Sequence, residues 1–183
     1  MTSEVSDQER FSRAIDDLNS LVRDPRKGLD QQLFLLISRL TPMVNVDLLI
    51  NDALGTLLVW REDQFYRGWH IPGGIIRFKE LAKDRIREVA RLELNVAVGH
   101  DEEPIAVNQK INTERDVRGH FIALLYRCCL LEPLPEERRC LDLHRPAPGQ
   151  WAWHASPPDT LLPQHQVYRA FIGKAGSGPK EST

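Results

Sequence analysis

The amino-acid sequence predicts an α/β domain with a mixed β-sheet, preceded by a helical extension. Apolar residues recur at helical spacing within residues 1–40, they alternate with a period of two over residues 44–50, and a strand, a glycine turn and a helix span residues 68–94. The 183 residues suit one domain with a core of its own. We expect the domain to occupy residues 41–173. Residues 174–183 are polar and contain Gly, so we expect a disordered tail there.

Composition argues against several classes of function. Charged residues make up 27% of the chain and the formal net charge is −2, so neither nucleic acid nor a membrane is predicted as a partner. The sequence shows no signal-peptide pattern and no apolar run long enough to span a bilayer, from which we expect a cytoplasmic protein. The cysteines are odd in number and lack metal-binding spacing, which predicts free thiols in a reducing compartment. They are Cys128, Cys129 and Cys140.

Two amphipathic helices are predicted in the extension. Ser6 and Glu9 have the spacing of a capping box at the start of the first helix. The apolar stripe of this helix consists of Phe11, Ile15, Leu18 and Val22. Asp30 is a candidate N-cap for a second helix that runs through Leu40. The extension carries no catalytic pattern, and we expect it to pack on the domain or on a second subunit.

Alternating residues and turn residues predict the remaining elements. The first strand covers residues 44–50, turn residues follow at 51–55, and the return strand covers 57–60. Later strands are expected at 104–110, 119–131 and 151–153, and a closing helix at 163–172. The stretch 132–150 contains four prolines and no periodic pattern. Loops of this length in compact domains often carry function.

The stretch 68–74 organises the domain. Its polar and apolar residues alternate as in a half-buried strand, and Pro72 ends the strand because proline cannot donate to a ladder. Gly73 and Gly74 permit a positive φ or the close approach of another group. Residues 80–94 contain neither Gly nor Pro and are rich in helix formers, so a helix is predicted to follow.

Glu93 is the unusual residue of this helix. At about 100° per residue it falls on the apolar arc, between Ala82 and Ile86. A carboxylate on a core-facing arc is costly unless it is compensated, and Mg²⁺ or Mn²⁺ supplies such compensation. Two alternatives stay open. In the first, Glu93 reaches water from the last turn of the helix. In the second, it pairs with Arg85, which lies on the same arc.

The spacing of Gly74, Glu80 and Glu93 resembles the Nudix box of the Nudix hydrolases, G-x5-E-x7-R-E-U-x-E-E-x-G-U, in which U is apolar. Gly73 belongs to the usual Pro-Gly-Gly lead-in, and Val96 fits the last apolar position. The chain departs from the box at four positions, where Glu88, Val89, Leu92 and Asn95 replace Arg, Glu, Glu and Gly. One of the three usual metal-binding carboxylates is therefore present.

One branch of this superfamily, the GDP-mannose mannosyl hydrolases, lacks the same Glu residues. The chain is similar to this branch beyond the box as well. Residues 41–47 with 57–61 resemble its first hairpin, and residues 120–124 resemble a later central strand. The similarity covers roughly residues 40–172. The resemblance implies a Nudix-type α/β/α sandwich, Mg²⁺ or Mn²⁺ as cofactor and a homodimer.

The resemblance also implies roles for single residues. Asp47 is expected to contact the base or sugar, and Arg61 a phosphate, whose geometry an Arg fork matches. Without the resemblance, a strand-face Asp and a surface Arg are the simpler interpretations. Arg77 is expected to face the diphosphate, although that branch has its Arg where Ile75 stands here. His144, in the long loop, is expected to act as general base.

The other expected site residues lie in or near the box. Glu93 and the backbone around Gly74 are expected to bind the metal. The structural residues of the box are expected to be Gly73, Glu80 and Arg87, with Glu80 paired to Arg87. His120 is expected to contact the substrate, with a hydrogen-bonded strand histidine as the alternative.

Three functions are compatible with this sequence. The first is Mg²⁺-dependent hydrolysis of a nucleoside diphosphate sugar of the GDP-mannose type, which releases the free sugar and a nucleoside diphosphate. The second is a Nudix pyrophosphohydrolase that cleaves P–O–P, with carboxylates recruited from Glu102, Glu103 or Glu114. The third is a non-catalytic nucleotide-binding domain, which the apolar Val89 and Leu92 favour.

Overall fold

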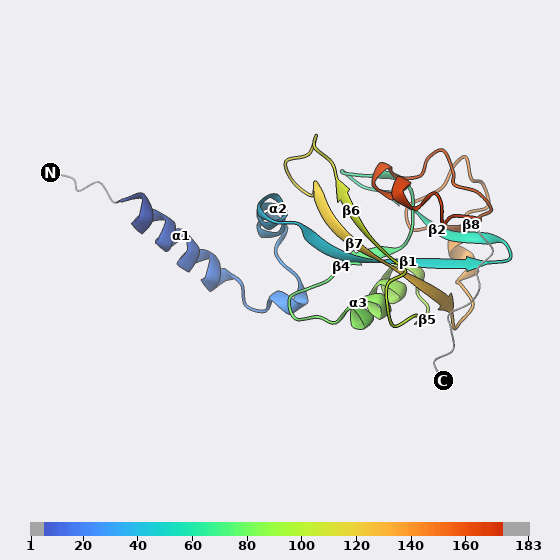
Figure 1. The fold of residues 1–183 in the computed structure, drawn as a ribbon, viewed down its shortest axis with the longest axis horizontal. Helices are drawn as coiled ribbons and strands as arrows, with labels where there is room; N and C mark the ends of the chain where they lie inside the picture. The colour runs from blue at the N-terminus through green and yellow to red at the C-terminus, as the bar shows by residue number, and fades with distance from the viewer. Residues whose placement is uncertain (1–5, 174–183) are drawn as a thin grey trace.

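The computed structural model describes residues 6–173, so the predicted tail at 174–183 lies outside the described residues. Three helical segments precede the sheet, namely α1 (Asp7–Leu21), the 3₁₀ turn η1 (Pro25–Lys27) and α2 (Gln31–Leu40). Ser6 and Glu9 form the predicted capping box of α1, and Asp30 caps α2. α1 buries none of its residues and projects away from the rest of the molecule (Figure 1).

The described strands form one mixed sheet. They are β1 (Met43–Asp52), β2 (Gly55–Glu62), β3 (Arg67–His70), β4 (Gly73–Ile75), β5 (Val98–His100), β6 (Ala106–Ile111), β7 (His120–Leu130) and β8 (Trp151–His154). The main path runs β3-β2-β1-β7-β5, while β4, β6 and β8 pair with β1, β7 and β2. β1 runs parallel to β7, and the other pairs are antiparallel.

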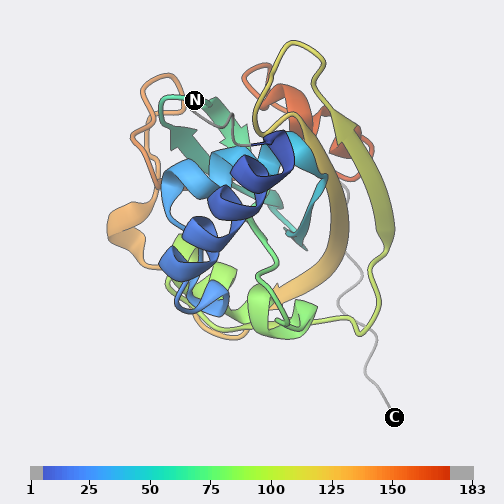
Figure 2. The same ribbon diagram turned by 90° about the vertical axis from the view of Figure 1, so that its left-hand side faces the viewer.

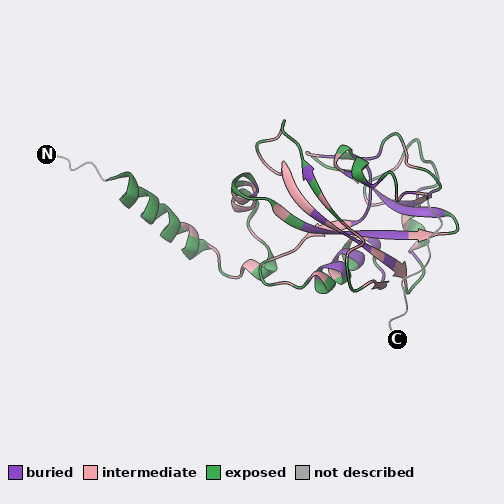
Figure 3. Cartoon of the chain, viewed as in Figure 1, coloured by how far each residue is buried: buried purple, intermediate pink, exposed green. Residues whose placement is uncertain are grey.

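Apolar residues pack against both faces of this sheet. On one face, α3 (Ala82–Val89) and the π-helical turn η2 (Ala90–Leu94) cover β1, β2 and β7 (Figure 2). On the other face, η4 (Pro163–Tyr168) contributes to a second apolar cluster. Residues 46–50 of β1 are therefore all buried (Figure 3), although the sequence pattern predicts alternation. A central strand covered on both sides has no solvent-facing positions. This is the predicted α/β/α arrangement.

The helix after the glycines differs from the single helix predicted over residues 80–94. The α-helix begins at Ala82 and widens at Ala90 into η2. Lys79 has a φ of 58°, so the chain turns in the left-handed region before the helix starts. Asn95 ends η2 with a φ of 57°. Gly and Asn tolerate this conformation best, which explains how Asn replaces the Gly of the Nudix box here.

The closing segment also differs from the prediction. Residues 163–172 were expected to form a helix, but η4 is a 3₁₀ helix that ends at the fully buried Tyr168. The long stretch between β7 and β8 contains the short 3₁₀ turn η3 (Glu136–Arg138). All three cysteines are free thiols, as predicted. Within residues 6–173, no helix has the length and apolar character needed to cross a bilayer.

Candidate active site

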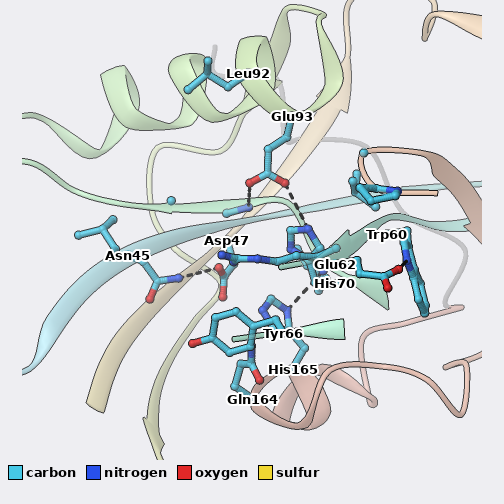
Figure 4. Close-up of a pocket in the computed structure, with 18 of the residues that line it drawn as sticks. Asn45, Asp47, Trp60, Glu62, Tyr66, His70, Leu92, Glu93, Gln164 and His165 are labelled. Carbon is cyan, nitrogen blue, oxygen red and sulfur yellow. Dashed lines mark hydrogen bonds and ion pairs between the residues drawn. The ribbon is translucent and has the colours of Figure 1, made fainter. Parts of the chain in front are cut away.

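A cavity of about 480 Å³ opens between β1, β3, β4, η2 and η4 (Figure 4). Its acidic lining residues are Asp47, Glu62 and Glu93. Its basic lining residues are Arg61, Lys110, Arg118 and Arg138, and two histidines, His70 and His165, also line it. The excess of cationic side chains favours an anionic ligand.

Glu93 points into this cavity from η2 (Figure 4). Its Oε1 accepts a hydrogen bond from the backbone N–H of Gly73 at 3.3 Å, and its Oε2 lies 3.5 Å from Nε2 of His70. Oε2 has no hydrogen-bond partner among the described residues. Burial raises the pKa of Glu93 to about 8, against the lowering effect of the Gly73 hydrogen bond. Arg85 pairs with Glu80 instead, so the alternative of a pair between Glu93 and Arg85 is wrong. The side chain of Glu93 is 26% exposed, so it reaches water through the cavity.

The backbone of Glu93 is held from the long loop. Nη2 of Arg138 donates to the carbonyl oxygen of Glu93 at 2.7 Å and to that of Gly149, also at 2.7 Å. The sequence pattern did not single out Arg138, because its partners are backbone atoms far along the chain. This bridge ties η2 to the loop and fixes the end of the turn that carries Glu93.

His70 and His165 are buried neutral histidines, and His70 lies beside Glu93. Burial lowers the pKa of His70 to about 3 and holds that of His165 well below its usual value. The backbone N–H of Ile71 donates to Nδ1 of His165 at 3.3 Å, which places the ring proton of His165 on Nε2. The rings of the two histidines meet edge to face at 5.7 Å. In the sequence, His70 stands out only by its place in the strand before the glycines. No pattern there indicates which side chain it contacts.

Asp47 lines the cavity, as expected, but protein groups occupy its oxygens. Nζ of Lys110 and the hydroxyl of Tyr168 both donate to Oδ2 at 2.5 Å. Nδ2 of Asn45 donates to Oδ1 at 2.6 Å. Only 1% of the surface of Asp47 is exposed. This arrangement favours a structural role, in which Asp47 neutralises Lys110 at the cavity wall, over the expected substrate contact.

Arg61 also lines the cavity, as the sequence reasoning expected. Its Nε donates to Oδ2 of Asp63 at 2.6 Å, and its guanidinium lies over the ring of Tyr66, 4.6 Å from the centroid. Both contacts fix the side chain at the end of β2. The free edge of the guanidinium remains available for an anion.

Three expected site residues lie outside the lining of this cavity. Nη1 of Arg77 donates to the carbonyl oxygen of Arg26 at 3.3 Å, which holds it at the N-terminal extension. Nε2 of His120 lies 3.0 Å from Nε2 of Gln109 in a cross-strand pair. His144 is exposed in the long loop. The structure thus assembles Asp47, Arg61, Gly74 and Glu93 but does not bring these three residues to them.

Glu80 has a structural partner, but it is not the predicted Arg87. Oε2 of Glu80 accepts hydrogen bonds from the backbone N–H of Arg77 and from Nε of Arg85, each at 2.8 Å. Arg87 instead pairs with Asp84 on the helix surface. Glu80 precedes the helix, so helical spacing does not decide which residue it meets. Arg85 is 4% exposed, and the pair therefore lies inside the domain.

The two glycines are needed for close packing, since neither has a positive φ. A Cβ on Gly73 would collide with Oδ1 of Asp47. A Cβ on Gly74 would lie 2.7 Å from Cγ2 of Val89. Of the two reasons that the sequence suggested for glycine here, only close approach applies. The glycines let β4 pass between Asp47 and the helix, which brings the N–H of Gly73 to Glu93.

Glu93 is the acidic residue of the cavity that fits a metal ion. Within residues 6–173, no group of three His, Cys, Asp or Glu residues could enclose a metal. Val89 is buried in the core, Leu92 lines the cavity, and Glu102 and Glu103 line neither this cavity nor a second one described below. Mg²⁺ commonly binds through one or two carboxylates, waters and substrate phosphates. The unpartnered Oε2 of Glu93 fits that mode.

Comparison with known proteins supports the fold. No family model matches the chain. The chain is 34% identical over 94 residues to the low-salt glycan biosynthesis protein Agl8 of Haloferax volcanii. That match covers 49% of this chain and 60% of Agl8, so the chain spans about three fifths of the length of this curated relative.

Two solved structures are similar to this chain. A possible asymmetric diadenosine tetraphosphate (Ap(4)A) hydrolase from Jonesia denitrificans matches 72% of this chain and 94% of its own, with a TM-score of 0.54 and 16% identity. A Nudix hydrolase from Nitrosomonas europaea matches 56% of this chain and 67% of its own, with a TM-score of 0.46 and 14% identity. At these identities the likeness concerns the fold alone. The chain has a Nudix-like α/β fold with a mixed sheet.

Proposed function

We propose that this protein is a Mg²⁺-dependent hydrolase of nucleoside diphosphate sugars that releases the free sugar and a nucleoside diphosphate. The observation that carries the proposal is the state of Glu93. Among the acidic residues of the cavity, Asp47 is neutralised by Lys110 and Glu62 pairs with Arg67, whereas Glu93 has no cationic Lys or Arg partner. The name of the relative Agl8, a glycan biosynthesis protein, supports a sugar-linked substrate.

The charged residues of the cavity suit a diphosphate. Arg61 and Arg118 line the same cavity as Glu93 and would supply positive charge to a diphosphate, whereas the charge of Lys110 is neutralised by Asp47. The N–H of Gly73 and the ring of His70 orient the Glu93 carboxylate. Glu93 would hold a Mg²⁺ ion, whose positive charge would stabilise the leaving diphosphate. Because the cation favours the ionised carboxylate, it would lower the raised pKa of Glu93.

The proposed reaction breaks the bond between the sugar and the diphosphate. A water oxygen bonds to the anomeric carbon and releases a proton to the solvent, and the carbon–oxygen bond to the β-phosphate breaks with its electron pair on the leaving diphosphate. The same cavity can serve the alternative attack at phosphorus, which yields a nucleoside monophosphate and a sugar phosphate. The two reactions differ in their products, so a product assay distinguishes them.

The test is incubation of the protein with a panel of nucleoside diphosphate sugars, with and without Mg²⁺, followed by identification of the products. Free sugar with nucleoside diphosphate is the expected result. Sugar phosphate with nucleoside monophosphate would show the pyrophosphohydrolase reaction instead. Water labelled with ¹⁸O adds a second readout, because the label enters the sugar in the first reaction and a phosphate in the second.

A non-catalytic nucleotide-binding domain is the second candidate. Val89 and Leu92 favour it, because they replace two of the usual metal-binding carboxylates with apolar side chains. Thermal stabilisation by nucleotide sugars without any product would support this function. The homodimer implied by the resemblance stays a prediction, which light scattering on the purified protein tests.

A further inference from the structure

A second cavity of about 340 Å³ adjoins the first. Five residues line both cavities: Tyr66, Lys110, Arg118, Phe121 and Gln164. The second cavity extends away from Glu93, between the loop that joins β6 to β7 and the helix η4. A ligand that reaches past this common wall therefore occupies both cavities.

Arg118 stands at the common wall with its charge uncompensated. Its guanidinium lies over three aromatic rings, with the centroid of Phe34 at 5.3 Å, that of Phe65 at 5.1 Å and that of Tyr66 at 5.4 Å. Among the ion pairs and side-chain hydrogen bonds of residues 6–173, none involves this guanidinium, and its Nε is buried without a partner. A half-buried guanidinium without an acceptor is costly, and an anion relieves that cost.

Arg115 adds a second positive charge on the same side. Its Nη2 donates to the carbonyl oxygen of Phe65 at 2.6 Å, and its guanidinium lies 4.6 Å from the ring centroid of Tyr66. Nη1 is buried without a hydrogen-bond partner, and no carboxylate of the described residues forms an ion pair with Arg115. Glu114 lines the same cavity but is not paired with either arginine. The second cavity is therefore electropositive at its inner wall.

The N-terminal extension holds Arg118 in place. Oγ of Ser38, on α2, accepts a hydrogen bond from the backbone N–H of Arg118 at 3.1 Å, and Ser38 is 4% exposed. Phe34, one turn earlier on α2, supplies one of the three rings. Arg118 also has a φ of 54°, in the left-handed region that bulky residues rarely adopt. Helix α2 thus fixes both the backbone and the side chain of this arginine.

We propose that Arg118, supported by Arg115, binds a phosphate group of the substrate at the wall between the two cavities. The part of the substrate beyond that phosphate then occupies the second cavity. This inference rests on the proposed function in so far as the ligand is a nucleoside diphosphate derivative. A guanidinium fork matches two phosphate oxygens, and the aromatic rings hold the fork rigid before the ligand arrives. Phe34 and Ser38 act as positioning residues.

Binding without turnover is the direct test. Isothermal titration in EDTA, on the full chain carrying Glu93→Gln, uses inorganic pyrophosphate and GDP-mannose as probes. We expect both probes to bind, and Arg118→Gln to weaken both by about tenfold or more. Arg118→Lys keeps the charge but loses the fork, so its affinities should lie in between. Arg91→Gln, an exposed arginine on η2, is the matched control and should leave both affinities unchanged.

Two more variants separate the parts of the proposal. Val167 lines only the second cavity and is 43% exposed, so Val167→Trp fills that space without entering the core. We expect it to weaken GDP-mannose at least tenfold and to leave pyrophosphate unchanged. Phe34→Leu should weaken pyrophosphate binding, and Phe34→Tyr should restore it, because the ring and not the hydroxyl supports the arginine.

The proposal is overturned if Arg118→Gln binds pyrophosphate as tightly as the Glu93→Gln parent does. It is also overturned if one of the two probes fails to bind the parent at millimolar concentration. These results are independent of catalysis. If the unmodified chain hydrolyses no nucleotide sugar but pyrophosphate binding depends on Arg118, the subsite stands and the proposed reaction fails. If hydrolysis occurs with a KM that Arg118→Gln does not change, the reaction stands and the subsite fails.

Discussion

Nε2 of His70 and Oε2 of Glu93 lie 3.5 Å apart in the interior of the cavity, on side chains from β3 and η2. Burial acts on the two groups in opposite directions, since it lowers the pKa of the histidine to about 3 and raises that of the carboxyl to about 8. Burial therefore favours the uncharged form of both groups in the ligand-free protein. A cation that binds beside Glu93 would favour the ionised form of its carboxyl group.

Replacement of Glu93 by Gln should abolish hydrolysis while the fold is kept. Gln has the same shape and can still accept from the N–H of Gly73, but it cannot ionise. We expect the hydrolysis rate to fall by about a hundredfold or more, on the scale of acid–base and electrostatic groups in active sites. Glu88→Gln, on the same helix and paired with Arg91, is the control and should retain activity. A fully active Glu93→Gln enzyme would contradict the assigned role.

Removal of Asp47 should destabilise the protein strongly. Asp47→Ala leaves the ammonium group of Lys110 buried without its counter-ion, a change that typically costs about 3–5 kcal/mol. The double variant Asp47→Ala/Lys110→Met removes both charges and should unfold at a higher denaturant concentration than Asp47→Ala alone. Urea denaturation of the two variants measures the difference. If the double variant were the less stable one, charge burial would not be the reason for the loss.

The partner of Glu80 can be identified by stability measurements. Glu80→Ala leaves the buried guanidinium of Arg85 unpaired, and we expect a loss of about 3 kcal/mol in the free energy of unfolding. Arg87→Ala removes only an exposed pair with Asp84, so its effect should stay within about 0.5 kcal/mol. Thermal denaturation of both variants checks this. Similar losses in the two would favour the pairing that helical spacing suggested.

Buried His154 should make the protein less stable in mild acid. Burial lowers its folded-state pKa to about 4, below the ordinary value of 6.5, so the unfolded chain takes up the proton first. Its contribution to stability is therefore complete above pH 6.5 and is lost as the pH falls towards 4. His154→Phe keeps the edge contact with Trp69 but removes the titration. We expect the variant to lose about 3 kcal/mol less than the native protein between pH 7.5 and pH 4.

Urea denaturation at several pH values measures this difference. His70 and His165 also have lowered pKa values and stay in the variant, so it should still lose some stability in acid. Parallel stability curves for the native protein and His154→Phe would show that the pKa of this histidine is the same in the folded and unfolded states.

Local rules predicted most of the elements. The capping residues Ser6 and Asp30 set the starts of both N-terminal helices, and the strand before Pro72 with the following helix placed the centre of the fold. These features depend on neighbours within a few residues, which a sequence displays directly. The same local reasoning placed Glu93 on the inner side of the helix.

Partners far apart in the chain were not predictable in this way. Helical spacing predicted Arg87 as the ion-pair partner of Glu80. Glu80 lies in the turn before the helix, however, and binds Arg85, while Arg87 pairs with Asp84. Arg77 and His144 carry suitable chemistry, yet the fold directs them away from the cavity. Sequence spacing gives the face on which a side chain lies, but not the group that it meets there.

The sequence by itself determined the order of the elements, the two glycines and the one carboxylate that remains of the three usual metal-binding carboxylates of the Nudix box. Only the tertiary structure decided that Glu93 lies beside His70 and that α2 supports Arg118 at the wall of the cavity. The physical reason is that helices and strands follow from interactions between near neighbours. The charge state and the orientation of a site follow from burial and from contacts between segments that folding brings together.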